Sequence, residues 1–393
     1  MIALALRCGI AGAALTVLGV RPLRAQDSSA VRWHPTVVVF PSYSAVAGPG
    51  VVAGAGLHKP QRDGPRPVAG LVDVVGRLTL SGTRAIGVGA DLPGIWPRWR
   101  VLGLAVAEHL EEFNYYGLGN NRIDYDSTVA LHGKGFFRYE LIRTTASAAL
   151  QREVVPRVRA HVAAEFRHYA VRPAAGRTLL GDELAVGLPR DTGSADGLSL
   201  RAGLVYDTRD DELVPSRGVM VELLGARSVV HPWAVPYTRW LAAARVFVPL
   251  GTNLVLGVRQ SVEVGTRAMP IAVMAERLTS WRPGDGFGGA STIRTSRPGR
   301  WLGPNRYVVS VELRDGVELG SAGDGARRVL WLVPFLDVGG LWNASGSTTP
   351  ARLHGGLGTC VVLQNSPLGN LGTTLAYTGS DGFQIQLTSG FTF

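Results

Sequence analysis

Apolar and polar residues alternate along the last eleven positions of the chain, 383–393. Successive side chains of a strand point to opposite faces, so this pattern predicts a strand with one apolar and one polar face. We expect it to close a transmembrane β-barrel, with its apolar face toward lipid. A soluble β-sandwich that ends in a strand is the alternative. The apolar face would hold Phe383, Ile385, Leu387, Phe391 and Phe393.

The same two-residue period recurs over 158–169, 198–209 and 306–314, where charged residues occupy the second face. These charges need water or partners, which the lumen of a barrel or the outer surface of a sandwich would supply. Several runs reach about ten residues or more. Soluble strands usually have five or six residues, whereas tilted membrane strands need about ten. Strand length therefore favours the barrel.

Twelve further strands are predicted, and with the four runs above they indicate an all-β, antiparallel barrel of about 16 strands. No helical period persists long enough to predict a helix. Two long segments, 171–196 and 266–305, are rich in Gly, Pro and Arg and are expected to be functional loops at the outer face. The twelve strands lie near 35–44, 48–57, 67–80, 83–92, 99–110, 136–150, 217–226, 237–249, 253–265, 329–342, 353–364 and 370–377.

The N-terminal 25 residues have the features of a secretory signal peptide. Arg7 precedes an apolar stretch from Ile10 to Val20, and Ala25 is a small residue at the expected cleavage site. No later stretch has the roughly 18 apolar residues of a membrane helix. The predicted organisation is a signal peptide at 1–25, a short periplasmic tail at 26–34 and an outer-membrane barrel at 35–393.

Composition narrows the candidate functions. The net charge is +10, with 40 Lys and Arg against 30 Asp and Glu. Because the arginines are scattered over strands and loops, we expect a basic lumen or contact with anionic lipid, and no nucleic-acid partner. Cys360 alone would remain after cleavage of the signal, so no internal disulfide or cysteine metal site is expected.

Catalytic motifs have little support. His109-Leu110-Glu111-Glu112 lacks the second histidine of a zinc-protease helix, and the chain has no Gly-x-Ser-x-Gly elbow. We therefore predict no catalytic residues, no metal and no cofactor. A membrane-anchored hydrolase that assembles Ser and His from distant strands is an alternative that the sequence leaves open.

Three segments resemble, in order, the motifs of BamA/TamA-like outer-membrane assembly barrels of the bacterial surface antigen superfamily. The first is a strand and turn, Tyr206-Asp207-Thr208-Arg209-Asp210 followed by Pro215-Ser216-Arg217-Gly218. The second, Ser291-Thr292-Ile293-Arg294, stands where that family has its V-R-G-F/Y loop motif. The third, Phe335-Leu336-Asp337-Val338-Gly339, matches its F/G-x-D-x-G strand motif. The alternation up to Phe391 and Phe393 also resembles the C-terminal targeting signal of such barrels.

The chain departs from this family in two respects. The loop motif reads Ile293-Arg294-Thr295-Ser296, without the Gly and the aromatic residue. The nine residues between the signal and the first strand are too few for the family's periplasmic POTRA domains, so a barrel without them is expected.

The resemblance implies that the loop arginine folds into the lumen and meets acids on neighbouring strands. Carried over to this sequence, that is a structural cluster of Arg294, Glu312 and Asp337. The alternative is a solvated Arg294, one of several loop arginines with Arg297 and Arg300.

The implied function is insertion or translocation of protein, or lipid-related transport, at the outer membrane. A porin-like diffusion channel with a basic lumen is the alternative from another class. Expected partners are outer-membrane lipid and a periplasmic protein that supplies the missing domains, while the client is unknown.

Overall fold

The structure is a computed structural model of the whole chain. It describes residues 32–393 except 45–47, 62–65, 67, 121–122, 188–192, 231–235, 267–268, 282–283, 285, 322–326, 343–351, 367–368, 380, 389–390 and 392. The predicted signal peptide and most of the predicted periplasmic tail lie outside these described residues. Among them, no helix is long and apolar enough to cross a membrane.

In the described part of the chain, sixteen strands form one sheet, in which each strand pairs with its neighbours in sequence. All of the predicted strands are present. Their bounds are β1 His34–Ser44, β2 Gly48–Pro60, β3 Val68–Thr79, β4 Arg84–Pro93, β5 Trp99–Asn114, β6 Arg138–Val155, β7 Val158–Pro173, β8 Gly193–Asp207, β9 Gly218–Val230, β10 Thr238–Pro249, β11 Leu254–Gly265, β12 Arg306–Ser321, β13 Arg327–Leu341, β14 Arg352–Ser366, β15 Gly369–Thr378 and β16 Gly382–Thr388.

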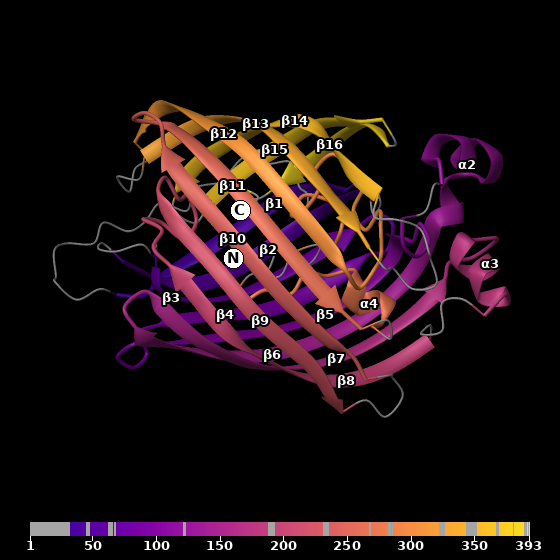
Figure 1. Cartoon of the computed structure of the whole chain (residues 1–393), viewed down its shortest axis with the longest axis horizontal. Coiled ribbons are helices and arrows are strands. Elements are labelled where there is room, and N and C mark those ends of the chain that lie inside the picture. The colour runs from indigo at the N-terminus through magenta and orange to yellow at the C-terminus, as the bar shows by residue number, and fades with distance from the viewer. Residues whose placement is uncertain are drawn as a thin grey trace.

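Every pairing between neighbouring strands is antiparallel. Figure 1 shows the sheet curving round into a barrel wall, with the later strands in front of the earlier ones. Among the described residues, no hydrogen-bonded ladder joins the first strand, β1, to the last strand, β16. An all-β antiparallel barrel of about 16 strands is confirmed.

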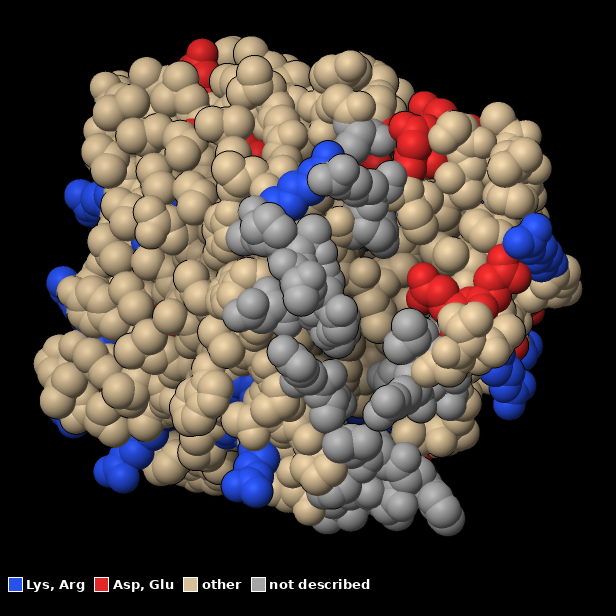
Figure 2. All heavy atoms as spheres, turned by 45° about the vertical axis from the view of Figure 1, so that its right-hand side comes forward, with Lys and Arg blue, Asp and Glu red and all other residues tan. Residues whose placement is uncertain are grey.

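The wall has an apolar outer face and a polar inner face, as the alternation predicts. Along β13, Leu330, Leu332 and Leu336 point outward and are exposed, whereas Phe335 and Asp337 point inward and are buried. In Figure 2, charged side chains gather toward the two ends of the barrel, and the wall between them is mainly uncharged. This arrangement suits a wall that faces lipid outside and protein or water inside.

The two ends of the barrel differ. The long connections, 115–137, 174–192 and 266–305, lie at one end, and the connections at the other end are all short. Because outer-membrane barrels have long extracellular loops and short periplasmic turns, the first end is extracellular. Figure 1 places the helices α2 (Tyr125–His132), α3 (Leu179–Ala185) and α4 (Ile271–Met274) there.

The expectation that the chain has no helix is wrong for these loops. The helices are short, and local capping supports two of them. Asp124 accepts a hydrogen bond from Ser127 N at the start of α2, and Thr178 accepts one from Gly181 N at the start of α3. Because α2 buries none of its residues, it carries no apolar period that a sequence reading could detect.

The last strand is shorter than predicted. β16 ends at Thr388, so Phe391 and Phe393 lie beyond the strand instead of on its lipid-facing side. Phe383 and Ile385, inside the strand, are exposed as predicted. The alternation thus correctly identifies the strand but not its end.

Candidate functional site

The long loop 266–305, between β11 and β12, runs inside the barrel. Its residues Phe287, Ile293 and Trp301 are almost fully buried and pack against Val308 and Leu341 on the inner wall. A loop exposed at the surface would keep its backbone in water. This loop instead occupies the lumen, and the structure makes it the candidate functional site.

Arg294 of this loop lies between two acids of the inner wall. Its Nη1 is 2.8 Å from Glu312 Oε2, and its Nη2 is 2.8 Å from Asp337 Oδ1. Nε and the backbone N–H both donate to Asp337 Oδ2. All three side chains are at most 1% exposed. The structure therefore brings together the residues of the predicted cluster, which we call the Arg294 anchor (Arg294, Glu312 and Asp337).

The two acids are placed by the strand register. Glu312 on β12 pairs with Phe335 on β13, and Ser310 pairs with Asp337, so both carboxylates are on the inner face at neighbouring levels. The ring of Phe335 lies 3.6 Å below the Arg294 guanidinium carbon. Such stacking and bidentate pairing both suit the planar guanidinium of arginine and not the ammonium of lysine.

The glycine of the strand motif makes room for the loop. A Cβ on Gly339 would lie 2.4 Å from Tyr307 O and 2.8 Å from the ring of Phe287, which is closer than any side chain tolerates. Gln386 of β16 binds the loop on its other side, because its amide donates to the backbone oxygens of Arg294 and Ser296. The conformation of the loop is thus fixed around the Arg294 anchor.

Charge pairing outweighs burial at Arg294. Burial alone would lower the pKa of the guanidinium, but Asp337 and then Glu312 raise the pKa above its ordinary value. The arginine therefore stays charged, and two acids close to each other stay compensated. Removing it would leave Asp337 buried without its arginine, while Glu312 would keep only its pair with Arg314.

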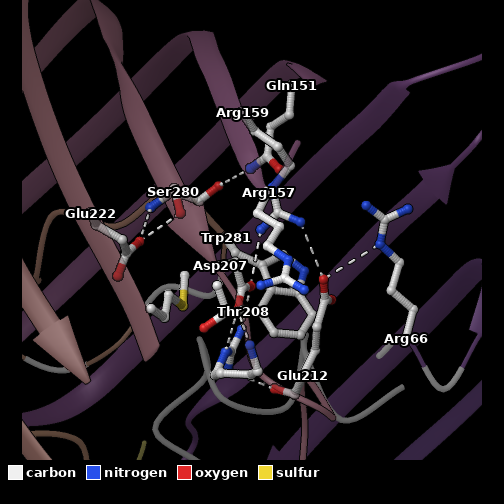
Figure 3. Close-up of polar contacts among 12 residues, drawn as sticks. Arg66, Gln151, Arg157, Arg159, Asp207, Thr208, Glu212, Glu222, Ser280 and Trp281 are labelled. Atoms are coloured by element: carbon white, nitrogen blue, oxygen red, sulfur yellow. Dashed lines mark hydrogen bonds and ion pairs between the residues drawn. The ribbon is translucent and has the colours of Figure 1, made fainter. Parts of the chain in front are cut away.

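A second part of the loop crosses the lumen to the opposite wall. Trp281 Nε1 donates to Asp91 Oδ2 of β4 at 3.0 Å, and the Arg100 guanidinium of β5 lies 4.9 Å from the indole ring. Ser280 donates from its backbone and its hydroxyl to Glu222 of β9. We call these five residues the Trp281 anchor. Figure 3 shows Ser280 directed toward Glu222 and Trp281 among the arginines.

The Trp281 anchor continues into the turn between β8 and β9. Glu212 in this turn accepts two hydrogen bonds from Arg100 at 3.0 Å and also pairs with Arg159 and Arg66 (Figure 3). Burial alone would raise the pKa of Glu212, but Arg100 and Arg159 outweigh it and lower the pKa to about 2. Sequence reading missed Glu212 and Trp281, because neither belongs to a motif and their partners are far away in sequence.

The residues of the first motif build this turn. Asp207 binds Arg209 and Arg159, and Asp210 accepts hydrogen bonds from Ser216. Thr208 and Val219 exchange hydrogen bonds across the turn. Gly218 has a φ of +107°, and a Cβ there would lie 2.5 Å from Thr208 O, so only glycine fits. Tyr206, which directly precedes Asp207, points outward and is exposed.

The extracellular end of the lumen is packed with apolar and charged groups of the same loop. The four residues of α4 join an apolar cluster with Tyr139 and Tyr169 of the wall. Glu276 next to α4 pairs with Arg143 and Arg167 of β6 and β7. The loop is therefore attached to the inner wall at the extracellular end as well, and its side chains occupy part of the lumen there.

Phe391 and Phe393 contact the inner wall. The Phe391 ring packs edge-on against Trp331 at 5.7 Å, and the Arg314 guanidinium lies 4.2 Å from it. The Phe393 ring lies 6.1 Å from that of Phe247 and 4.9 Å from the Arg259 guanidinium. Their role as a targeting signal stays a prediction.

The described residues contain no group of three or more His, Cys, Asp or Glu side chains arranged to hold a metal ion. Cys360 is buried, and its Sγ lies 3.0 Å from Thr374 Oγ1. The polar groups of the lumen are arranged as ion pairs that fix a loop.

An apolar outer wall around a polar lumen that holds an inserted loop is the architecture of an outer-membrane β-barrel. The Omp85 superfamily domain matches residues 134–393. The chain therefore belongs to the Omp85 superfamily. This confirms the predicted outer-membrane location of the barrel and its resemblance to BamA-like proteins. The porin-like and hydrolase alternatives gain no support.

Solved structures show the same fold at low sequence identity. CdiB from Escherichia coli is similar with a TM-score of 0.61 and 14% identity, over 97% of this chain and 67% of that chain. BamA from Haemophilus ducreyi lacking POTRA domains 1–3 gives a TM-score of 0.58 and 13% identity, over 92% and 70%. No curated protein matches the sequence. The described residues of this chain form the barrel and no POTRA domain.

Proposed function

We propose that this chain inserts or translocates protein at the outer membrane, and that it does so without catalysis. The observation that carries the proposal is the loop 266–305, which lies in the lumen and is fixed to one wall by a buried ion pair and to the opposite wall by a hydrogen bond from Trp281. A passive channel needs an open, water-filled path. A loop held by exchangeable ion pairs suits a barrel that changes shape around a client.

The proposal includes export and a partner. Residues 1–25 would direct secretion, and the outward apolar face would contact outer-membrane lipid. The short turns at the periplasmic end, with the motif turn 206–218 among them, would face a periplasmic protein that delivers the client. No nucleic acid takes part.

Reconstitution in liposomes tests the proposal. The probe client is a urea-unfolded, eight-stranded outer-membrane barrel, and the readout is its rate of conversion to a folded, protease-resistant form. An arm with an unfolded secreted passenger scores protease protection inside the vesicle. We expect faster folding or protection than in liposomes that hold an unrelated porin. For each client, a rate equal to that in the porin liposomes, together with a large steady conductance of the protein, would contradict the proposal.

A further inference from the structure

The periplasmic end of β6 carries an arginine on the lipid-facing side of the wall. Gln151 is buried and binds the loop in the lumen, so its neighbour Arg152 points outward, where it is exposed. The outward positions that precede Arg152 on this strand, Ala146, Ala148 and Leu150, are exposed and apolar. The apolar band of a transmembrane barrel ends at the membrane interfaces. Arg152 therefore lies at the depth where the wall meets the headgroups of the periplasmic leaflet.

An aromatic ring packs beside this arginine. Trp99 of β5 is the register partner of Arg152, and the guanidinium carbon lies 5.3 Å from the centre of the indole ring. Trp96, in the adjoining turn, is exposed. Tryptophan is enriched at membrane interfaces, where the ring contacts apolar groups and the N–H reaches polar ones. The outer wall thus presents an apolar and a cationic group side by side at this depth.

Two further arginines occupy strained backbone positions in the neighbouring turns. Arg98, between β4 and β5, has a φ of +66°, and Arg157, between β6 and β7, has a φ of +69°. Among the described residues other than glycine, these two alone have a positive φ. Glycine would adopt this conformation without strain, and it is the usual residue after the proline of a turn like Pro156-Arg157. Strain of this kind is typical of functional positions, so it points to a role for the two side chains.

Backbone hydrogen bonds join the two turns. Glu153 N donates to Arg98 O at 2.9 Å, and Glu153 Oε1 accepts a hydrogen bond from Arg157 N at 2.9 Å. The carboxylate of this segment is therefore bound to the backbone. In the described part of the chain, no carboxylate forms an ion pair with Arg98, Arg152 or Arg157, and all three side chains are exposed. Their guanidinium groups can therefore reach a ligand from outside the barrel.

We infer that Arg98, Arg152 and Arg157, together with Trp99, bind the phosphate of an anionic phospholipid in the periplasmic leaflet. We call these four residues the rim site. Guanidinium groups bind phosphate oxygens through parallel hydrogen bonds, and basic clusters beside a membrane attract anionic lipids. The apolar wall that continues from Arg152 toward the membrane centre would contact the acyl chains of the same lipid. An acidic protein would match the charges but would leave this apolar surface without a use.

Native mass spectrometry of the purified full-length barrel in detergent tests the rim site. The probes are phosphatidylglycerol, which has a net negative charge, and zwitterionic phosphatidylethanolamine with the same acyl chains. The readout is the dissociation constant of the first bound lipid. We expect the wild type to bind phosphatidylglycerol about tenfold more tightly. This measurement does not depend on whether the barrel inserts or translocates protein.

Two variants separate binding from structure. Arg152→Gln should weaken the binding of phosphatidylglycerol about fivefold, because one cation near the membrane surface is lost, and should leave phosphatidylethanolamine unaffected. Arg157→Gly should weaken it similarly. Because glycine relieves the strained φ, the temperature at which R157G loses its heat-modifiable gel mobility should equal or exceed that of the wild type.

Arg328→Gln is the matched control. Arg328 is at the periplasmic end of β13 and is exposed on the outer face beside the buried Val329, but it is not part of the rim site. R328Q should keep the wild-type preference for phosphatidylglycerol.

Three results would overturn the inference. Equal affinity of the wild type for both lipids would leave an acidic protein surface as the partner of these arginines. A loss in R328Q as large as that in R152Q would reduce the rim site to a general attraction of a basic barrel end. Full affinity for phosphatidylglycerol in both R152Q and R157G would show that the rim site does not bind the headgroup.

Discussion

The two anchors of the loop 266–305 differ in where they attach and in how they bind. The Arg294 anchor attaches the loop to β12, the strand that directly follows it, and to the neighbouring β13. It does so through ion pairs that are fully buried. The Trp281 anchor joins residues 190 positions apart, across the lumen, through an indole N–H and a partly exposed Asp91. The Arg294 anchor therefore fixes the loop to the hairpin of β12 and β13. The Trp281 anchor holds the loop across the lumen, against β4 and β5.

This difference suggests which anchor is able to move. Breaking a buried ion pair costs about 3–5 kcal/mol, whereas one hydrogen bond to a charged group is worth about 1.5–3 kcal/mol. The Trp281 anchor is also linked to the motif turn through Glu212. The Arg294 anchor is linked to the same turn, because Arg314 pairs with Glu312 and donates to Pro215 O. Since the contact at Trp281 is the weaker of the two, we expect the Trp281 anchor to open first while the Arg294 anchor stays closed.

The largest expected effect is at the Arg294 anchor. Arg294→Ala leaves Asp337 buried without its arginine and leaves Glu312 with Arg314 alone, so we expect about 3–5 kcal/mol of destabilisation in urea unfolding monitored by gel mobility. Arg294→Lys should recover only part of this, because lysine lacks the planar fork. Arg177→Ala, an exposed loop arginine, is the matched control. A loss below about 1 kcal/mol would be typical of a solvated arginine and would contradict the anchor.

Asp337→Asn tests whether the Arg294 anchor acts as one unit. The single variant should destabilise the barrel, since Asp337 accepts three hydrogen bonds from Arg294. Combined with Arg294→Ala, it should add much less than its own effect, because both variants break the same interaction. A double-mutant cycle in urea measures this coupling. If the unfolding free energies lost in the two single variants simply add in the double variant, Arg294 and Asp337 do not act as one unit.

Glu212→Gln should have the next largest effect, about 2 kcal/mol, because the buried Arg100 keeps Asp91 but loses one charged partner. The effect depends on pH. The pKa of Glu212 is lowered from 4.5 to about 2 in the folded state, so its contribution is complete above pH 4.5 and is lost as the pH falls toward 2. Stability profiles of the wild type and of E212Q should therefore converge in this interval. Parallel profiles down to pH 2 would contradict the role of Glu212.

Trp281→Phe should weaken the second anchor by about 1–2 kcal/mol, because it keeps a ring beside Arg100 but loses the N–H bond to Asp91. Trp281→Ala removes both. The two variants should increase conductance fluctuations in planar bilayers in this order, while the Arg294 anchor stays closed. Fluctuations that increase in R294A but not in W281A would reverse the comparison between the two anchors.

The sequence predicted the barrel well because its signal is repeated. Each of the sixteen strands contributes a weak alternation, and the lumen-facing charges strengthen it. The end of β16 was missed, because the apolar positions continue past Thr388 with the same period. Alternation cannot show whether Phe391 and Phe393 face lipid or fold inward, since both places accept aromatic rings.

The candidate site was only half predictable. Arg294, Glu312 and Asp337 stand in or beside recognisable motifs, so a resemblance was able to bring them together. The Trp281 anchor has no motif, and its contacts depend on how a loop crosses a lumen. Asp91, Arg100 and Glu212 read as ordinary inner-face or turn residues until the fold places them. Long-range contacts of this kind follow from the three-dimensional path of the loop and not from local periodicity.

The smallest expected effect concerns Phe393. Its ring lies 4.9 Å from the Arg259 guanidinium and 5.9 Å from that of Arg314, which in turn binds Glu312 of the Arg294 anchor. Cation–π contacts of this kind are worth about 0.5–2 kcal/mol, so Phe393→Leu should destabilise the barrel by about 0.5–1 kcal/mol. Phe383→Leu is the matched control, because that ring is on the exposed outer face and meets no buried arginine.

Two measurements on the same pair of variants separate the roles of Phe393. Urea unfolding reports its contact with the inner wall, and the yield of assembled barrel in the outer membrane reports targeting. If Phe393 supports the Arg294 anchor, F393L loses stability, and this loss shrinks when Arg294→Ala is already present. If it acts only in targeting, F393L lowers the yield and leaves the unfolding free energy equal to that of F383L. An unchanged yield and an unchanged stability would show that the ring of Phe393 serves neither role. The Arg294 anchor would then be held without any contribution from the terminal aromatic ring.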